Sequence, residues 1–237
     1  MQQQAVECRF ASSDSWVILS PIEQSIKQKI DTIGTPLKDW NINIYRGVLT
    51  GYNDAFIIST EKRNEILANC QTEDERTRTA ELIRPILRGR DIKRYSYDWA
   101  NLWLINTHNG IKGKIPRIQI ENYPAIKAHL DQYWEKISTR ADKGDTPYNL
   151  RNCAYMEDFS KPKIVWGEIS DKSKFAFDFL GEYIPEATTF YLNGEYIEYL
   201  LTALNSSVSE WLFSKTGTTT GVGTICIFRR IPVQHFR

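Results

Sequence analysis

Basic and aromatic side chains gather in two stretches of this chain. In the first, five cations fall within eleven residues and three aromatic residues follow: Arg84, Arg88, Arg90, Lys93 and Arg94, then Tyr95, Tyr97 and Trp99. The second surrounds a polar segment at residues 139–152 and comprises Arg140, Lys143, Tyr148, Arg151, Tyr155, Lys161 and Lys163. Loop cations can neutralise phosphates, and arginine can read a guanine edge through two hydrogen bonds. The pattern indicates a local nucleic-acid surface, although such charges also lie on solvated faces, paired with acids such as Glu81 and Asp91.

Thirteen residues make up the predicted DNA-contacting set. We expect the first basic cluster to occupy one turn and strand start, where it holds the phosphate backbone. The polar loop at residues 139–152 is the candidate for reading bases. Threonine and asparagine side chains near glycine-containing turns could add hydroxyl or amide contacts, but tight-turn roles explain them equally well. The set is Thr50, Asn53, Arg88, Arg90, Lys93, Arg94, Arg140, Lys143, Tyr148, Arg151, Lys161, Thr218 and Thr219.

Motifs for catalysis were sought and not found. The chain has no Pro-Pro dipeptide, so it lacks the Asp/Asn-Pro-Pro-aromatic tetrapeptide that an amino-methyltransferase uses to hold a flipped base. Glu168 and Asp171 are the best carboxylate pair for a metal-dependent nuclease, but their spacing to Lys172 is unsuitable. The glycine-rich stretch at residues 217–223 lacks the Gly-Lys-Ser/Thr ending of a phosphate-binding loop. We therefore predict no catalytic, cofactor-binding or metal-binding residue.

Composition limits the choice further. Thirty basic residues balance 29 acidic ones, which argues against a uniformly basic protein that coats nucleic acid without specificity. The four cysteines are far apart and have no histidine at ligand spacing, so the sequence indicates neither zinc nor disulfides and favours the cytoplasm. No stretch resembles a membrane span or a signal peptide. Aromatic content is high, and we expect Trp103, Trp134, Trp166 and Trp211 in the core.

The elements that must position these residues follow from periodicity. Ser20-Pro21-Ile22-Glu23 is a capping box that opens an amphipathic helix. Alternating residues predict a hairpin from strands at 40–48 and 55–58, and further strands are expected at 102–105, 163–166, 175–177 and 188–192. Helical spacing predicts helices over 60–70, 72–84, 124–138 and 198–213. The expected fold class is α+β, with residues 1–39 as a helical lead-in and residues 40–237 as the main domain.

Distinctive blocks of sequence follow one another along the chain. The first block is GVLTGYNDAF at residues 47–56, followed by LIRPILRGRDIKRY at 82–95 and WLINTHNG at 103–110. After these come YPAIKAHLDQY at 123–133, FSKPKIVWGEIS at 159–170, and finally ATTFYL at 187–192 with GTTTGVGT at 217–224. In this order the blocks resemble those of one known family, the TaqI-like C-terminal specificity domain, and the resemblance extends from about residue 16 to residue 224.

This resemblance implies a DNA target-recognition domain of a type IIG restriction endonuclease and adenine-specific DNA methyltransferase. The implied fold is a curved, mostly antiparallel β-sheet with surrounding helices, like the recognition domains of type I specificity subunits, with loops facing the major groove. The implied partners are double-stranded DNA and the methyltransferase and nuclease parts of the parent enzyme. The start of the chain suggests a fragment or a standalone module, and its last residues suggest a shortened end.

Two other functions stay open at this point. One is a protein-interaction module whose aromatic surface docks a methyltransferase or nuclease subunit. The other is a cryptic metal-dependent nuclease that uses Glu168 and Asp171.

Overall fold

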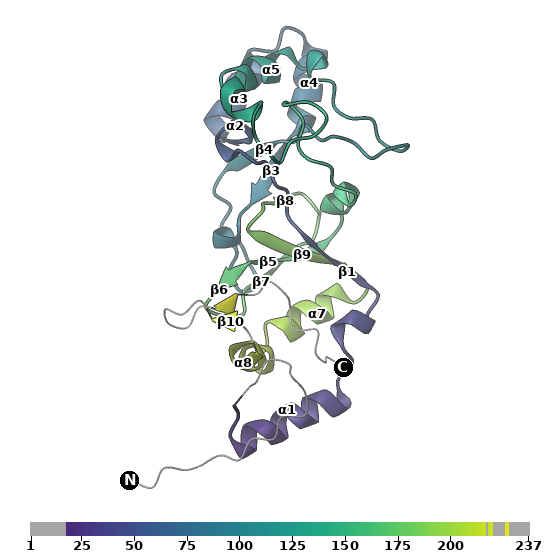
Figure 1. Ribbon diagram of the computed structural model, residues 1–237, viewed down its shortest axis with the longest axis vertical. Helices are drawn as coiled ribbons and strands as arrows, with labels where there is room; N and C mark the ends of the chain where they lie inside the picture. The colour runs from purple at the N-terminus through teal and green to yellow at the C-terminus, as the bar shows by residue number, and fades with distance from the viewer. Residues whose placement is uncertain (1–17, 217, 220–225, 228–237) are drawn as a thin grey trace, which may run out of the picture. The chain divides into compact units, whose positions relative to one another are not determined.

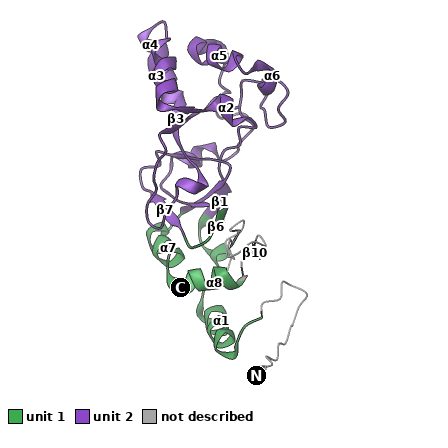
Figure 2. Ribbon diagram, turned by 90° about the vertical axis from the view of Figure 1, so that its left-hand side faces the viewer, with its two compact units in different colours: residues 1–42, 169–173, 194–237 green, residues 43–168, 174–193 purple. Residues whose placement is uncertain are grey.

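A computed structural model describes residues 18–216, 218–219 and 226–227 of the chain. The chain divides into two units, which Figure 2 colours separately. The first unit comprises residues 1–42, 169–173 and 194–237, and the second comprises residues 43–168 and 174–193. The predicted division after residue 39 lies close to the first of these boundaries, but residues from 194 onward join the first unit. None of the described helices is long and apolar enough to cross a lipid bilayer.

Two four-stranded sheets form the centre of the second unit (Figure 1). In the order of pairing, the first contains β1 (Ile42–Arg46), β9 (Thr189–Gly194), β5 (Lys163–Gly167) and β7 (Phe175–Asp178). The second contains β2 (Ile57–Ser59), β4 (Leu102–Ile105), β3 (Ile83–Leu87) and β8 (Ile184–Pro185). The pairs β5–β7, β5–β9, β2–β4 and β3–β4 are antiparallel, and β3–β8 is parallel.

Five helices belong to the second unit, and the first three of them contact the second of these sheets. They are α2 (Asn53–Phe56), α3 (Thr60–Ala68), α4 (Glu73–Leu82), α5 (Pro124–Asp131) and α6 (Trp134–Ile137), with short 3-10 turns η2 (Gly89–Asp91), η3 (Ile120–Asn122) and η4 (Met156–Ser160). Helix α3 contacts β2, β4, α4 and α5. Local sequence explains where they begin: Ser59 and Thr72 accept backbone N–H groups at the starts of α3 and α4, and Pro124 occupies the first turn of α5.

A single hydrophobic core joins the two sheets and the helices of this unit. Phe56, Ile86, Leu104, Ile126 and Tyr191 are all completely buried in it. Burying one such side chain contributes ~1.5–3 kcal/mol, so this core is the main source of rigidity for the loops that it carries.

The described residues of the first unit form three helices, a short turn and a small sheet. The helices are α1 (Pro21–Ile33), α7 (Ile197–Leu204) and α8 (Ser207–Thr216), and the turn is η1 (Leu37–Asp39). Strands β10 (Thr218–Thr219), β11 (Cys226–Ile227) and β6 (Ile169–Ser170) pair antiparallel. The predicted capping box of α1 is present, because Ser20 and Glu23 each accept a backbone N–H from the other. Glu23 also pairs with Lys215, which helps to hold its pKa down at about 2.

The α+β class and the mostly antiparallel pairing are confirmed, while three local predictions are wrong. The expected hairpin does not form, because β1 pairs with β9 and β2 pairs with β4. The expected helix at 124–138 is broken between α5 and α6 at Gln132 and Tyr133. Trp134 is 46% exposed and lies beside Tyr148, whereas Trp166 is buried as expected.

Candidate nucleic-acid interface

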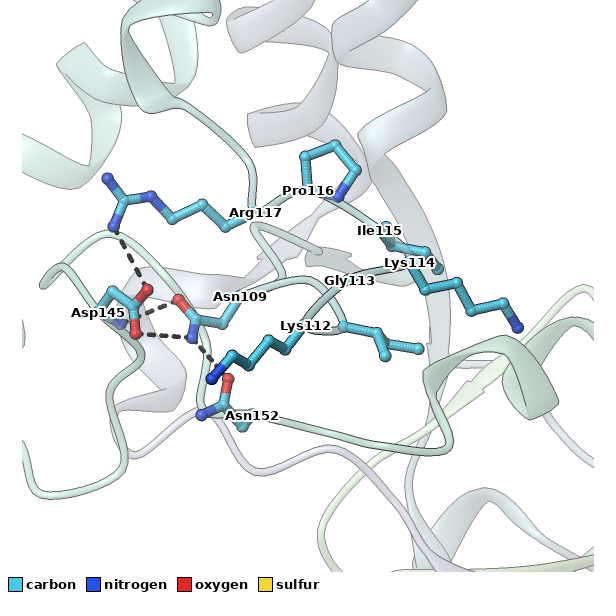
Figure 3. A pocket seen from close by; sticks show the side chains of 10 residues that line it. Asn109, Lys112, Gly113, Lys114, Ile115, Pro116, Arg117, Asp145 and Asn152 are labelled. Carbon is cyan, nitrogen blue, oxygen red and sulfur yellow. Dashed lines mark hydrogen bonds and ion pairs between the residues drawn. The ribbon is translucent and has the colours of Figure 1, made fainter.

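A cation-lined hollow of about 630 Å³ lies on the second unit (Figure 3). One side is a tight hairpin in which Ile111 and Ile115 exchange backbone hydrogen bonds and Gly113 forms the tip with φ +76°. Lys112 and Lys114 flank that tip, and Arg117 follows the hairpin. The 139–152 loop supplies the rest of the lining with Asp145 and Asn152. Three cations and one carboxylate therefore surround the hollow.

The cations differ in how strongly their charges are engaged. Lys114 pairs with Glu157, and Arg117 lies 3.4 Å from Asp145. Lys112 is exposed, and no acidic side chain among the described residues pairs with it. Exposed pairs of this kind are weak, contributing ~0.2–1 kcal/mol, so a phosphate can compete for their cations.

Buried Arg140 holds the 139–152 loop in shape. Its guanidinium donates to the carbonyl oxygens of Asp142, Pro147 and Asn149 at 2.7, 3.1 and 2.6 Å, and also to the carbonyl oxygen of Thr50. Its central carbon lies 4.4 Å from the centre of the Phe56 ring. Burial lowers the pKa of Arg140 to about 10, so the side chain stays charged at neutral pH. Only 7% of this residue is exposed.

Two asparagines join this loop to the segment that follows β4. Buried Asn149 donates to the carbonyl oxygen of Ile118 at 2.9 Å. Asn109 donates to Asp145 and Asn152 at 3.0 and 2.5 Å, and it accepts the backbone N–H of Asp145 at 2.9 Å (Figure 3). These bonds fix both walls of the hollow, which is the pre-organisation that specific binding requires.

Gly144 belongs to the same contact. A Cβ atom at this position would lie 2.5 Å from the side-chain oxygen of Asn109 and 2.6 Å from the carbonyl oxygen of Leu150. Position 144, which faces Asn109 of the block WLINTHNG, therefore requires glycine. Any larger side chain there would push the two walls of the hollow apart.

The first basic cluster forms η2 and the hairpin after it. Backbone atoms of Gly89 and Gly167 meet here, and a Cβ on Gly89 would lie 3.1 Å from the Cα of Gly167. The hairpin at residues 92–97 has Tyr95 at its tip with φ +65°, and the Tyr95 N–H donates to the Phe175 carbonyl oxygen at 2.9 Å. The segment is thus attached to both β5 and β7.

The basic side chains of this segment are of two kinds: one bonds to an acid inside the turn, and the others are exposed. Arg88 donates from Nε and Nη2 to the buried Asp91 carboxylate at 3.0 and 2.7 Å, and this bond raises its pKa. Its guanidinium is therefore engaged inside the turn. Arg90, Lys93 and Arg94 are exposed, and all three fall within a stretch of five residues. Lys93 has only a distant acid, Asp98, at 3.8 Å.

Several residues of the predicted DNA-contacting set make internal contacts in the structure. Arg140 is buried, as described. The buried Thr50 hydroxyl donates to Asn53 Oδ1 at 2.5 Å, which fits the tight-turn alternative. The Tyr148 hydroxyl donates to Asp131 at 2.6 Å. Lys163 of the second basic stretch is completely buried and pairs with Asp178 at 2.6 Å.

The remaining predicted residues are exposed or lie outside the described side chains. Lys143 donates to the Ser138 carbonyl oxygen, Arg151 pairs with Asp142 at 3.0 Å, and Lys161 pairs with Asp158. Thr218 and Thr219 form β10, and their side chains lie outside the described part of the structure.

Lys112, Lys114 and Arg117 were missed in the sequence. Their signal was available, because IKGKIPR places two lysines around a glycine between two isoleucines, which is the pattern of a hairpin with a basic tip. These cations lie in a short basic hairpin rather than in a long basic cluster.

The residues considered for metal chemistry are engaged elsewhere. Glu168 pairs with Arg46 at 3.3 Å. Within the described part of the chain, no group of three or more His, Cys, Asp or Glu side chains could hold a metal ion.

Comparison with known proteins gives two matches. The family model of the TaqI-like C-terminal specificity domain matches residues 84–230, which is more than half of the chain. A solved structure of the type IIL restriction-modification enzyme MmeI in complex with DNA is similar, with a TM-score of 0.54 and 13% sequence identity. The similarity covers 78% of this chain and 24% of the MmeI chain, and at this identity it supports the fold alone. No curated protein matches.

The matched region contains η2, the hollow, β5 and the 139–152 loop that Arg140 holds in shape. Its family, its α+β fold and the fold of its solved relative agree with one another. This chain belongs to the family of TaqI-like C-terminal specificity domains, and it is a recognition module of the kind that restriction-modification enzymes carry.

Proposed function

We propose that this chain recognises a specific sequence in double-stranded DNA, as the target-recognition domain of a type IIG restriction endonuclease and adenine-specific DNA methyltransferase. Membership of the specificity-domain family is the observation that carries this proposal. The parent enzyme would act in the cytoplasm and supply the methyltransferase and nuclease parts.

The residues that we propose to contact DNA lie around the hollow and in the 89–97 segment. Lys112, Arg90, Lys93 and Arg94 are exposed cations on loops that the core holds rigid. Lysine acts as a point charge on a phosphate, whereas the planar guanidinium of Arg117 suits two parallel hydrogen bonds to a guanine edge. We therefore assign backbone contacts to Lys112 and Lys93, and base reading to Arg117.

The test is a binding measurement on a selected duplex. Duplexes would be enriched from a random pool on the protein, and their affinity would be measured by fluorescence anisotropy against random competitor at several salt concentrations. Lys112→Gln is expected to weaken all duplexes alike and to reduce the salt slope by about one. Arg117→Gln is expected to relax specificity at one base pair by ~1–3 kcal/mol.

A matched control separates the assigned residues from a general charge effect. Lys29→Gln removes the same charge from an exposed position on α1 and should leave affinity unchanged. Failure to enrich any duplex over random competitor would refute sequence recognition. Equal effects of Lys29→Gln and Lys112→Gln would refute the placement at the hollow. The double variant Arg90→Ala, Lys93→Ala tests the 89–97 segment, which unchanged binding would exclude.

A further inference from the structure

A second hollow, of about 470 Å³, lies within the first unit and has a different chemical character. Its lining combines three aromatic rings with two carboxylates, and none of the described residues that line it is a lysine or arginine. The residues that carry the argument are Trp40, Tyr196, Tyr199, Asp39 and Glu195. An acidic hollow of this kind repels phosphate, so it does not suit DNA.

The three rings are arranged around Trp40. The ring of Tyr199 is parallel to the indole, with an interplanar angle of 9° and a centroid distance of 6.1 Å. The ring of Tyr196 meets it edge-on at 83° and 6.4 Å. Both tyrosines are largely exposed, at 48% for Tyr199 and 72% for Tyr196. The faces of electron-rich rings attract cations when they are accessible in this way.

The backbone fixes the two walls of this hollow to each other. The Glu195 N–H donates to the Asn41 carbonyl oxygen at 3.1 Å, and the Asn41 side chain donates to Glu195 Oε1 at 3.0 Å. Gly194 permits this approach, because a Cβ there would lie 2.4 Å from the Asn41 carbonyl oxygen. Tyr196 has the left-handed φ of +55°, a conformation that is strained for a tyrosine. The carboxylate and the rings are therefore held ready without a ligand.

We propose that this hollow binds the guanidinium group of an arginine on a polypeptide partner. Guanidinium is planar and weakly hydrated, so it stacks on tyrosine and tryptophan rings, and its N–H groups donate to carboxylates. A quaternary ammonium group would use the rings but has no N–H for Glu195 or Asp39. The site shares no residue with the proposed DNA surface and gives the chain a protein-docking point in addition to it.

The test uses a single blocked amino acid as the probe. ¹⁵N-labelled protein would be titrated with N-acetyl-L-arginine methylamide, with the citrulline analogue, which has the same shape without the charge, and with choline chloride. The signal is the indole N–H resonance of Trp40, assigned by its loss in Trp40→Phe. We expect a saturable shift with the arginine probe and a response at least about tenfold weaker with citrulline.

Two variants test the lining, and one tests its location. Tyr199→Leu and Glu195→Gln should each weaken the arginine response by about tenfold, and Glu195→Gln does so without changing side-chain shape. Tyr95→Leu removes an equally exposed tyrosine from the second unit and should leave the response unchanged. The other indole resonances report whether each variant is folded.

Several results would overturn this proposal. They are no saturable shift, an equal shift with citrulline, tighter binding of choline than of arginine, or an unchanged response in Glu195→Gln. DNA binding measured on the same Tyr199→Leu protein should equal that of the unmodified chain. Failure of the arginine site and failure of DNA recognition would therefore be seen in separate measurements.

Discussion

Replacing Arg140 with methionine should destabilise the chain strongly. Methionine has a similar length and no charge, so the substitution removes the hydrogen bonds with little change in volume. Four backbone carbonyl oxygens would lose the guanidinium as a donor, that of Asn149 keeping only the Gly144 N–H, and the ring of Phe56 would lose its cation. Because the loop is nearly closed to solvent at this point, water cannot replace all of these bonds.

The magnitude follows from the kind of interaction that is lost. A hydrogen bond from a charged group contributes a net ~1.5–3 kcal/mol, but bonds that share one side chain do not add. The desolvation that lowers the pKa of Arg140 also opposes them. A buried acceptor left unsatisfied costs ~1–3 kcal/mol, and water replaces only some of the lost bonds, so we expect Arg140→Met to lose ~3–5 kcal/mol of unfolding free energy.

Chemical denaturation with urea measures this loss directly. Arg151→Met is the matched control, because Arg151 lies in the same loop and its exposed pair with Asp142 should contribute only ~0.2–1 kcal/mol. Arg140→Lys should recover little, since an ammonium group cannot reach carbonyl oxygens spread around a planar fork. A loss below ~1 kcal/mol for Arg140→Met, or equal losses at Arg140 and Arg151, would refute this account of the loop.

Three further predictions concern the core and its pH dependence. Lys163→Met leaves the Asp178 carboxylate buried without its cation and should cost ~3–5 kcal/mol in the same denaturation experiment, a loss below ~1 being inconsistent with the ion pair. Gly89→Ala should cost ~1–3 kcal/mol by calorimetry, because its Cβ would lie 2.7 Å from a backbone oxygen, whereas full stability would show that the strands can separate freely. Burial holds the pKa of His108 and of His129 below the ordinary 6.5, so the unfolded chain binds protons first. The free energy of unfolding should therefore be greatest above pH 6.5 and fall as the pH decreases from there toward the lower pKa values of the folded chain. Denaturation at about pH 7.5 and about pH 5.5 measures this difference. A higher unfolding free energy at the lower pH would contradict the prediction.

Local signals in the sequence were sufficient for several elements. The capping box at Ser20 and the caps at Ser59 and Thr72 each involve residues only three positions apart, so they can be recognised without any knowledge of the fold. The apolar run before Trp166 likewise identifies a strand that is buried along its whole length. The ordered blocks identified the family, and the model match agrees.

Pairing between strands was beyond such signals. A turn at residues 50–54 between two apolar stretches favours a hairpin, yet β1 pairs with β9 from far along the chain. Each stretch pairs with a distant strand instead, because neither backbone hydrogen bonding nor hydrophobic contact depends on separation in sequence.

The amino-acid sequence alone established the family, the α+β class and the presence of basic loops. Folding then assigned each basic side chain its role: Arg140 meets the Thr50 carbonyl ninety positions away, and Lys163 meets Asp178 across a strand pair, so both become internal. Lys112 stays exposed beside the hollow. A cation reaches solvent or an interior partner according to which backbone oxygens and acids the folded chain brings within about 3 Å, and those partners are distant in sequence.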